Sequence, residues 1–345
     1  MGHKMVLSAL YATTLLVVLV QVTPARADGP PFDLPVECPT GQCDVVHYVD
    51  HDTGPGARDF ACGTSTYNDH RGTDFAIADE AAMIEGIAVQ TIAAGTIAAT
   101  RDGVEDIDAG RIPPDTLDGI ECGNGILVDH GDGWQSQYCH LRRGSVAVRK
   151  GDEVERGQMI GLIGMSGKAT FPHLHFNLRH DGVLIDPFSG TNMGNADPAQ
   201  CNTDQTALWT PDAAEQMTYR PITLYKTGFS SARPNATDIK RGYGRRNILP
   251  VTSPELYFWG YLIGAQNGDL IRLDIEGPNG FDGGREFVVE LPATGGLHAK
   301  MYHITAPRPD AGWTPGTYQG RILFSRKGSP HVEIGVADLV IGDGS

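Results

Sequence analysis

Residues 171–180 read FPHLHFNLRH, with two histidines two positions apart in a run that predicts a β-strand. Successive side chains of a strand point to opposite faces, so His173 and His175 would stand side by side on one face of a sheet. Two neighbouring imidazoles are typical of metal and catalytic sites, but a polar, solvent-facing strand shows the same pattern. The rest of the chain has to decide between these two interpretations.

A second cluster lies in the run NDHRGTDF at residues 68–75. Gly72 allows a tight turn, so His70 and Asp74 could point at one centre, although a solvated turn is the alternative. Catalytic zinc sites often combine three His and carboxylate ligands with a water molecule in the fourth position. His70, Asp74 and one histidine of the 171–180 run would supply that set, and the other histidine would stand beside the open position.

A third candidate is His140, in the run QYCHL at residues 137–141. This run closes the second strand of a predicted hairpin, whose turn is HGDG at residues 130–133. A buried structural histidine is the alternative interpretation. The polar residues of this strand favour a site over a core position.

Four motifs therefore follow one another along the chain. They are HxxxD at 70–74, YxHL at 138–141, GDxVxxGQxIGxxGxSG at 151–167 and PHLHF at 172–176. Together they resemble the lysostaphin/LytM-type zinc endopeptidases, which cut peptide cross-links of bacterial peptidoglycan. The resemblance covers about residues 62–187.

The resemblance implies one Zn²⁺ per chain, held by His70, Asp74 and His175, with His140 and His173 as the catalytic pair beside it. It implies an all-β catalytic domain built on a LytM-type antiparallel sheet. Zinc lowers the pKa of bound water and polarises the scissile carbonyl. The chain has no HExxH motif, so we expect an imidazole to take the proton of the attacking water.

Two features depart from the family pattern. Cys139 stands inside the YxHL motif, where the family more often has a small residue. The segment 102–120 is a longer insertion before the hairpin, and we expect it to form one wall of the cleft. Tyr67 and Arg71, beside the first ligand, are candidates for substrate contact, although a solvated loop is the favoured interpretation.

The N-terminus predicts a secretory signal over residues 1–27. Lys4 precedes the apolar run 15–20, and Ala25-Arg26-Ala27 is a small-x-small cleavage site. A membrane anchor is the alternative, but the apolar run is short for a span. We therefore expect a periplasmic or extracellular protein with no membrane span after signal removal.

Export would place the six cysteines in an oxidising compartment, which favours three disulfides. Cys38 and Cys43 are close enough to close a small loop. Cys122 and Cys139 flank the predicted hairpin, and Cys62 with Cys201 is left by elimination. Cysteine-ligated metal is the alternative, which the lack of any CxxC pair disfavours.

The chain divides by composition into three parts after the signal. Residues 28–60 are rich in Pro, Gly and Asp and predict an irregular leader. Residues 61–200 hold the motifs, on short β-type runs between glycine turns. Residues 201–345 show strand-like runs at regular short intervals, which predict an immunoglobulin-like β-sandwich, with Trp259 and Trp313 in its core.

The formal net charge of −15 argues against a nucleic-acid partner, which needs a basic surface. We expect a monomeric zinc metalloendopeptidase that hydrolyses peptide bonds of peptidoglycan cross-links or stems. The alternatives are a non-catalytic LytM-like module that binds or activates a cell-wall hydrolase, and a secreted protease acting on Gly-rich external proteins. All five site residues are present, which favours an enzyme over the non-catalytic module.

One further cluster lies in the leader. His47 and His51 stand near Asp44 and Asp50, which raises the hypothesis of a second metal site. Asp and Gly in such segments more often build turns, so the turn is the favoured interpretation.

Overall fold

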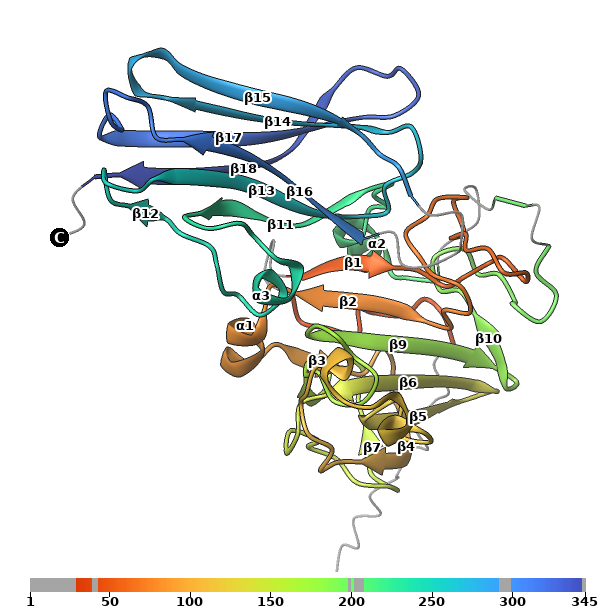
Figure 1. Ribbon diagram of the computed structural model, residues 1–345. Helices are drawn as coiled ribbons and strands as arrows, with labels where there is room; N and C mark the ends of the chain where they lie inside the picture. The colour runs from red at the N-terminus through yellow and green to blue at the C-terminus, as the bar shows by residue number, and fades with distance from the viewer. Residues whose placement is uncertain (1–28, 39–42, 198–199, 202–207, 292–298, 343–345) are drawn as a thin grey trace, which may run out of the picture.

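Strands make up most of the regular structure in this protein. The structure, a computed structural model, describes residues 29–38, 43–197, 200–201, 208–291 and 299–342 (Figure 1). The predicted signal peptide lies outside the described residues. Within them, no helix has the length and apolar content needed to span a bilayer. The helical segments are short: α1 (Glu80–Glu85), α2 (Pro211–Gln216), α3 (Ala236–Lys240), η1 (Ala109–Arg111), η2 (Pro114–Leu117) and η3 (Pro278–Gly280).

The motif-bearing region forms an eight-stranded antiparallel sheet, in the order β1-β2-β9-β6-β5-β4-β7, with β10 paired to β9. Its strands are β1 (Cys43–His47), β2 (Thr73–Ile77), β4 (Gly95–Arg101), β5 (Asn124–Gly131), β6 (Trp134–Leu141), β7 (Glu153–Val154), β9 (His173–His180) and β10 (Val183–Ile185). A second sheet pairs β3 (Ala88–Gln90) with β8 (Met159–Leu162). The mostly-β prediction for this region is confirmed.

The leader contributes an edge strand, which its composition did not predict. The run CDVVH forms β1 and pairs with β2, so residues 43–47 are not irregular. A Pro- and Gly-rich composition marks the surrounding turns, whereas two successive valines suit a pleated, half-buried edge. The leader is therefore part of the sheet that carries the candidate site.

The predicted hairpin is β5–β6. Gly131 pairs with Trp134, so the loop consists of Asp132 and Gly133, and both have positive φ. Two positive φ values are typical of the type I′ turn that suits the twist of antiparallel strands. The structure joins Cys122 to Cys139 across this hairpin, and it also contains Cys38–Cys43 and Cys62–Cys201.

The C-terminal region consists of two facing sheets. One has the order β11-β13-β16 and the other β12-β18-β17-β14-β15. Buried side chains from both sheets fill the space between them, including Trp313 as predicted. Trp259 is buried too, but on the outer face of its sheet, in a separate cluster with Val46 and Phe171, so its predicted place in the sandwich core is wrong. The strands are β11 (Thr223–Ser230), β12 (Ile248–Leu249), β13 (Glu255–Ile263), β14 (Leu270–Gly277), β15 (Phe281–Val288), β16 (Ala299–Pro307), β17 (Gly316–Ser325) and β18 (Val332–Ile341).

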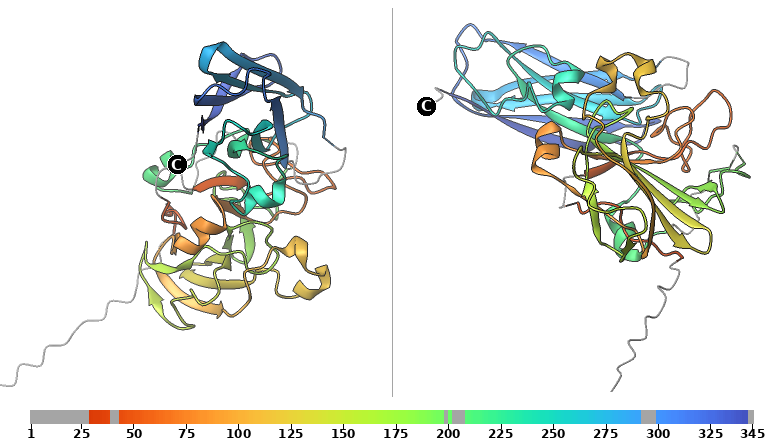
Figure 2. Two further views of the ribbon diagram at one scale, coloured as in Figure 1. Left: turned by 60° about the vertical axis from the view of Figure 1, so that its left-hand side comes forward. Right: turned by 90° about the horizontal axis from the view of Figure 1, so that it is seen from below.

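The C-terminal sandwich packs against the β1–β2 side of the N-terminal sheet (Figures 1 and 2). A buried apolar cluster fills this contact and includes Val46, Phe171 and Trp259. The Tyr225 hydroxyl donates to the carbonyl of Ile77 at 3.0 Å. The sandwich therefore covers the β1–β2 edge of the N-terminal sheet, and β2 carries Asp74 of the histidine cluster.

Candidate metal centre

Two neighbouring strands and one loop bring three candidate ligands together. Asp74 on β2 is the register partner of His175 on β9, so their side chains are adjacent on one face. His175 Nδ1 lies 2.8 Å from Asp74 Oδ1, and His70 Nε2 lies 3.1 Å from the same oxygen. The two histidine nitrogens are 3.2 Å apart. These three ligand atoms therefore converge on one point.

The loop before β2 fixes His70. Its Nδ1 lies 2.7 Å from the Tyr48 carbonyl oxygen, which can only accept, so Nδ1 carries the hydrogen and Nε2 keeps its lone pair. Gly72 lets the loop lie directly on β9. A Cβ at this position would stand 2.6 Å from the Phe176 carbonyl oxygen and 2.7 Å from His175 Cε1. A side chain at position 72 would separate the ligands.

The chemistry of this trio fits a divalent metal ion. Two neutral imidazole nitrogens and one carboxylate are the donor set of catalytic zinc sites with an open fourth position. Burial raises the pKa of Asp74, but electrostatic attraction to the His70 and His173 imidazoles and hydrogen bonds with His175 and His47 outweigh burial and hold this pKa well below its usual range. The carboxylate is therefore ionised and available as a ligand. Among the described residues this trio forms a group of the right size for a metal, with ligand atoms within 4.8 Å of one another.

The other two candidate histidines lie beside this trio. The rings of His140 and His173 are 4.7 Å apart, and the His140 ring is 5.8 Å from that of His175. His173 Nε2 lies 3.7 Å from Asp74 Oδ1. All five sequence-predicted site residues are thus gathered at one place.

Backbone carbonyls set the tautomers of this pair. His140 Nδ1 donates to the Ser166 carbonyl at 2.7 Å, and His173 Nδ1 donates to the Phe171 carbonyl at 2.8 Å. Each Nε2 therefore keeps its lone pair. His140 also has a φ of 62°, a left-handed conformation that is costly for a non-glycine residue and typical of functional sites.

Burial keeps both imidazoles neutral. It lowers the pKa of His173 to about 4, against the opposing attraction of Asp74. Burial holds the pKa of His140 well below its usual range, and the neighbouring imidazoles of His173 and His175 disfavour a second positive charge there. Near neutral pH, each Nε2 can therefore accept a proton.

The sequence profile described as Peptidase family M23 matches residues 68–187, which contain all five of these residues. Residues 68–187 form a peptidase family M23 domain. The peptidoglycan DD-endopeptidase ShyA of Vibrio cholerae is 35% identical over 109 residues, which are 32% of this chain and 20% of ShyA. Lysostaphin of Staphylococcus staphylolyticus is 31% identical over 153 residues, 43% of this chain and 30% of lysostaphin. The chain thus spans about a fifth to a third of the length of these relatives.

Among solved structures, a zinc-containing peptidase from Vibrio cholerae is similar to the chain. The two are 24% identical, with a TM-score of 0.32, and the similarity covers 46% of this chain and 39% of that one.

An open groove of about 730 Å³ borders the candidate metal centre on the His70 side. Arg71 lines this groove and is exposed, with an ion pair to Asp69 at 3.5 Å. Tyr67 is half-buried instead, and its ring packs 4.4 Å from the ring of His70. Arg71 therefore faces the open groove, whereas Tyr67 packs against the ring of His70.

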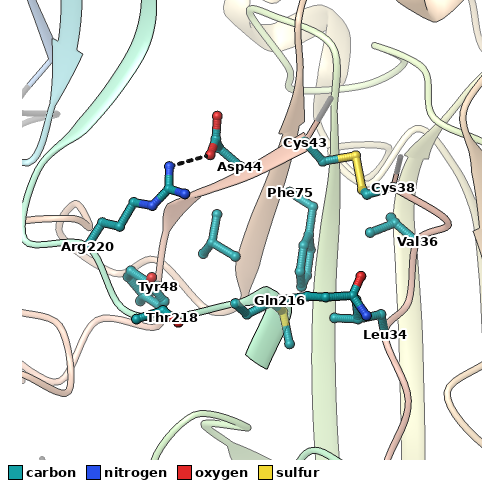
Figure 3. A pocket seen from close by; sticks show the side chains of 12 residues that line it. Leu34, Val36, Cys38, Cys43, Asp44, Tyr48, Phe75, Gln216, Thr218 and Arg220 are labelled. Carbon is teal, nitrogen blue, oxygen red and sulfur yellow. Dashed lines mark hydrogen bonds and ion pairs between the residues drawn. A yellow bond between two sulfur atoms is a disulfide. The ribbon is translucent and has the colours of Figure 1, made fainter. Parts of the chain in front are cut away.

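A separate cavity of about 440 Å³ lies on the other face of β2 (Figure 3). Phe75 points into it, whereas its neighbour Asp74 faces the metal centre. Figure 3 shows the ion pair from Arg220 to Asp44 at the rim, 3.1 Å long. This cavity takes no part in the M23 domain's histidine cluster.

The insertion at residues 102–120 lies beside His140. Val104 and Asn124 exchange two hydrogen bonds, and Asp106 Oδ1 accepts from the backbone N–H of Met165. Because Met165 directly precedes Ser166, whose carbonyl accepts a hydrogen bond from His140, the insertion supports the segment that holds the His140 ring.

The leader histidines are not neighbours in the structure. His47 Nδ1 lies 2.8 Å from Asp74 Oδ2, whereas His51 Nε2 lies 2.6 Å from Asp186 Oδ2. Asp50 is occupied by backbone N–H groups. The hypothesis of a second metal site at these residues is therefore wrong, because each side chain has a different partner. Sequence reasoning missed the contact of His47 with the metal centre.

Proposed function

We propose that this protein is an exported, monomeric zinc metalloendopeptidase that hydrolyses peptide bonds in peptidoglycan cross-links or stem peptides. The observation that carries the proposal is the convergence of His70, Asp74 and His175, with two neutral imidazoles beside them. The M23 match and the relatives named as peptidoglycan endopeptidases support the substrate class. The boundaries at 61–200 and 201–345 stay predictions.

We assign metal binding to Nε2 of His70, Oδ1 of Asp74 and Nδ1 of His175. Bound zinc would supply an acidified water ligand and polarise the scissile carbonyl. His140 and His173 are then the groups that move protons. One of them takes the proton of the attacking water at Nε2, and the resulting imidazolium can donate it to the leaving amine.

The backbone carbonyls of Ser166 and Phe171 assist this transfer. Each accepts a hydrogen bond from an Nδ1–H, which holds the ring in place and stabilises the charge that appears when Nε2 is protonated. The other imidazole of the pair is placed to stabilise charge on the carbonyl oxygen of the substrate.

The C-terminal region is proposed as an immunoglobulin-like domain. Its sheets β11-β13-β16 and β18-β17-β14-β15 follow the order of strands A-B-E and G-F-C-C′ of that fold. Tyr318, near the start of the F-like strand β17, donates to the carbonyl of Thr314 at 3.1 Å, which matches a tyrosine corner.

The test is digestion of purified peptidoglycan by the full chain, followed by mass analysis of the soluble products. We expect new peptide ends, loss of activity after chelation with EDTA, and recovery on adding Zn²⁺. A Gly-rich polypeptide serves as the comparison substrate. Intact peptidoglycan together with a cleaved polypeptide would support the external-protease alternative, and no cleavage of either would support the non-catalytic module.

A further inference from the structure

A histidine outside the M23 match contacts the candidate ligand Asp74. His47 ends β1, more than twenty residues before the first residue of the matched domain. Its Nδ1 lies 2.8 Å from Oδ2 of Asp74, the carboxylate oxygen that faces away from the other two ligands. One carboxylate thus has its Oδ1 in the ligand cluster and its Oδ2 held by His47.

A β-bulge aims this side chain. Val45 pairs with Phe75, and His47 pairs with Asp74, so Val46 is an extra residue in the ladder. In a regular strand Val46 and His47 would point to opposite faces. The bulge turns both to the face of Asp74, where Val46 joins a buried cluster with Ala76. Bulges next to active sites commonly re-aim a side chain in this way.

The His47 ring is buried and fixed by its neighbours. Its side chain is 2% exposed, with Tyr67 5.4 Å away and Phe171 6.2 Å away between ring centroids. Its Nε2 is buried without a hydrogen-bond partner among the described residues. An orphaned buried nitrogen is costly, and an apolar side chain would avoid that cost. Packing alone therefore does not explain a histidine here.

We propose that His47 is a positioning residue that orients the Asp74 carboxylate for metal binding. The proposal rests on the zinc site assigned above. A hydrogen bond to the second oxygen of a ligating carboxylate fixes which oxygen faces the metal, and such partners typically change metal affinity 10–100-fold when removed. The strand that precedes the M23 domain would thereby belong to its metal centre.

The test compares three substitutions of His47 in the full chain by competition for Zn²⁺ with a chromogenic chelator. His47→Asn places an amide N–H where Nδ1 stands, so we expect zinc affinity within about threefold of wild type. His47→Gln displaces the donor and His47→Phe removes it, and both should bind zinc 10–100-fold more weakly. Thermal unfolding of the metal-free proteins reports on folding separately.

His51→Phe is the matched control, because His51 is also a buried leader histidine with a carboxylate partner, but away from the ligands. It should lower stability and leave zinc affinity unchanged. Should His47→Phe not fold, the Asn and Gln variants still decide the matter. Equal zinc affinity of these two folded variants would overturn the proposal, as would an equal loss in His51→Phe. Wild-type protein that binds no zinc would instead refute the proposed function.

Discussion

At the scale of single residues, holding the metal and transferring protons are assigned to different histidines. His140 and His173 are outside the ligand trio, and each keeps an Nε2 lone pair. Replacing either by Ala should leave zinc content near one per chain and lower hydrolysis by about 10²-fold or more, as is typical for loss of a general acid–base group.

Zinc analysis and peptidoglycan turnover on the same preparation would check this division. His180→Ala is the control, because His180 lies at the other end of β9 and packs on Trp134 instead of the ligands. Wild-type turnover by a zinc-loaded His140→Ala or His173→Ala protein would show that the proton takes another route.

The sequence contained enough to find the four site histidines and the carboxylate of Asp74, but not the role of His47. The HxH and HxxxD patterns are local, since alternation in a strand and a glycine turn bring those side chains together. His47 reaches Asp74 through a bulge, and alternation counted from Val45 would have turned it to the opposite face. Pairing between strands 27 residues apart is not visible in a spacing pattern.

Among the secondary-structure elements, the loop before β2 lies so close to β9 that position 72 requires a glycine. Gly72→Ala would drive its methyl group into the Phe176 carbonyl and the His175 ring. We expect the free energy of unfolding to fall by about 1–3 kcal/mol, as for other overpacked sites. Zinc content should fall as well, because the strand that carries His175 must move.

Gly283→Ala is the control for this substitution, since a Cβ at Gly283 of β15 meets nothing within 4 Å. Chemical denaturation and metal analysis of both variants give the comparison. A Gly72→Ala protein with wild-type stability and zinc content would contradict the close approach.

Most strands could be predicted from the sequence because their runs are β-branched and bounded by glycine. The hairpin β5–β6 lies where the HGDG turn predicts it. The run EFVVEL at residues 286–291 is rich in aromatic and β-branched residues and predicts a strand. The observed strand, β15, spans Phe281–Val288 instead, because β14 pairs with Gly283 and Gly284 despite their low strand propensity.

At the scale of the whole molecule, the ion pair between Asp79 and Lys226 links the two domains. Lys226 Nζ lies 2.8 Å from Asp79 Oδ2, and the Ala82 N–H donates to Asp79 Oδ1. Burial raises the pKa of Asp79, but these hydrogen bonds and the Lys226 charge outweigh it, so the pKa lies below its usual value. Its stabilising effect is therefore present above about pH 4 and lost as the pH falls through the folded-state pKa.

Asp79→Asn tests this linkage, because Asn caps helix α1 as well as Asp does and only the charge changes. At pH 7 the variant should be less stable by up to about 1 kcal/mol, the size of a partly exposed ion pair. The difference should shrink below about pH 4, where the wild-type carboxyl also becomes protonated. Urea unfolding at pH 7 and pH 3 measures it, and a pH-independent difference would exclude the charge as the cause.

The docking of the sandwich could not be predicted from the sequence. It depends on Tyr225 and Lys226 meeting Ile77 and Asp79, about 150 residues earlier in the chain. The run of β-strands in residues 201–345 predicts a sandwich, but it gives no information on the surface that the sandwich covers.

Peptide hydrolysis in peptidoglycan should depend on a zinc ion held by the His70–Asp74–His175 trio. The most direct measurement is mass analysis of a defined cross-linked muropeptide dimer after incubation with zinc-loaded wild type and with Asp74→Ala. Wild type should convert the dimer into two stem peptides with the gain of one water molecule. Asp74→Ala, folded but without zinc, should leave the dimer intact. Cleavage by Asp74→Ala at the wild-type rate, or an intact dimer with the zinc-loaded wild type, would refute zinc-dependent hydrolysis at this trio.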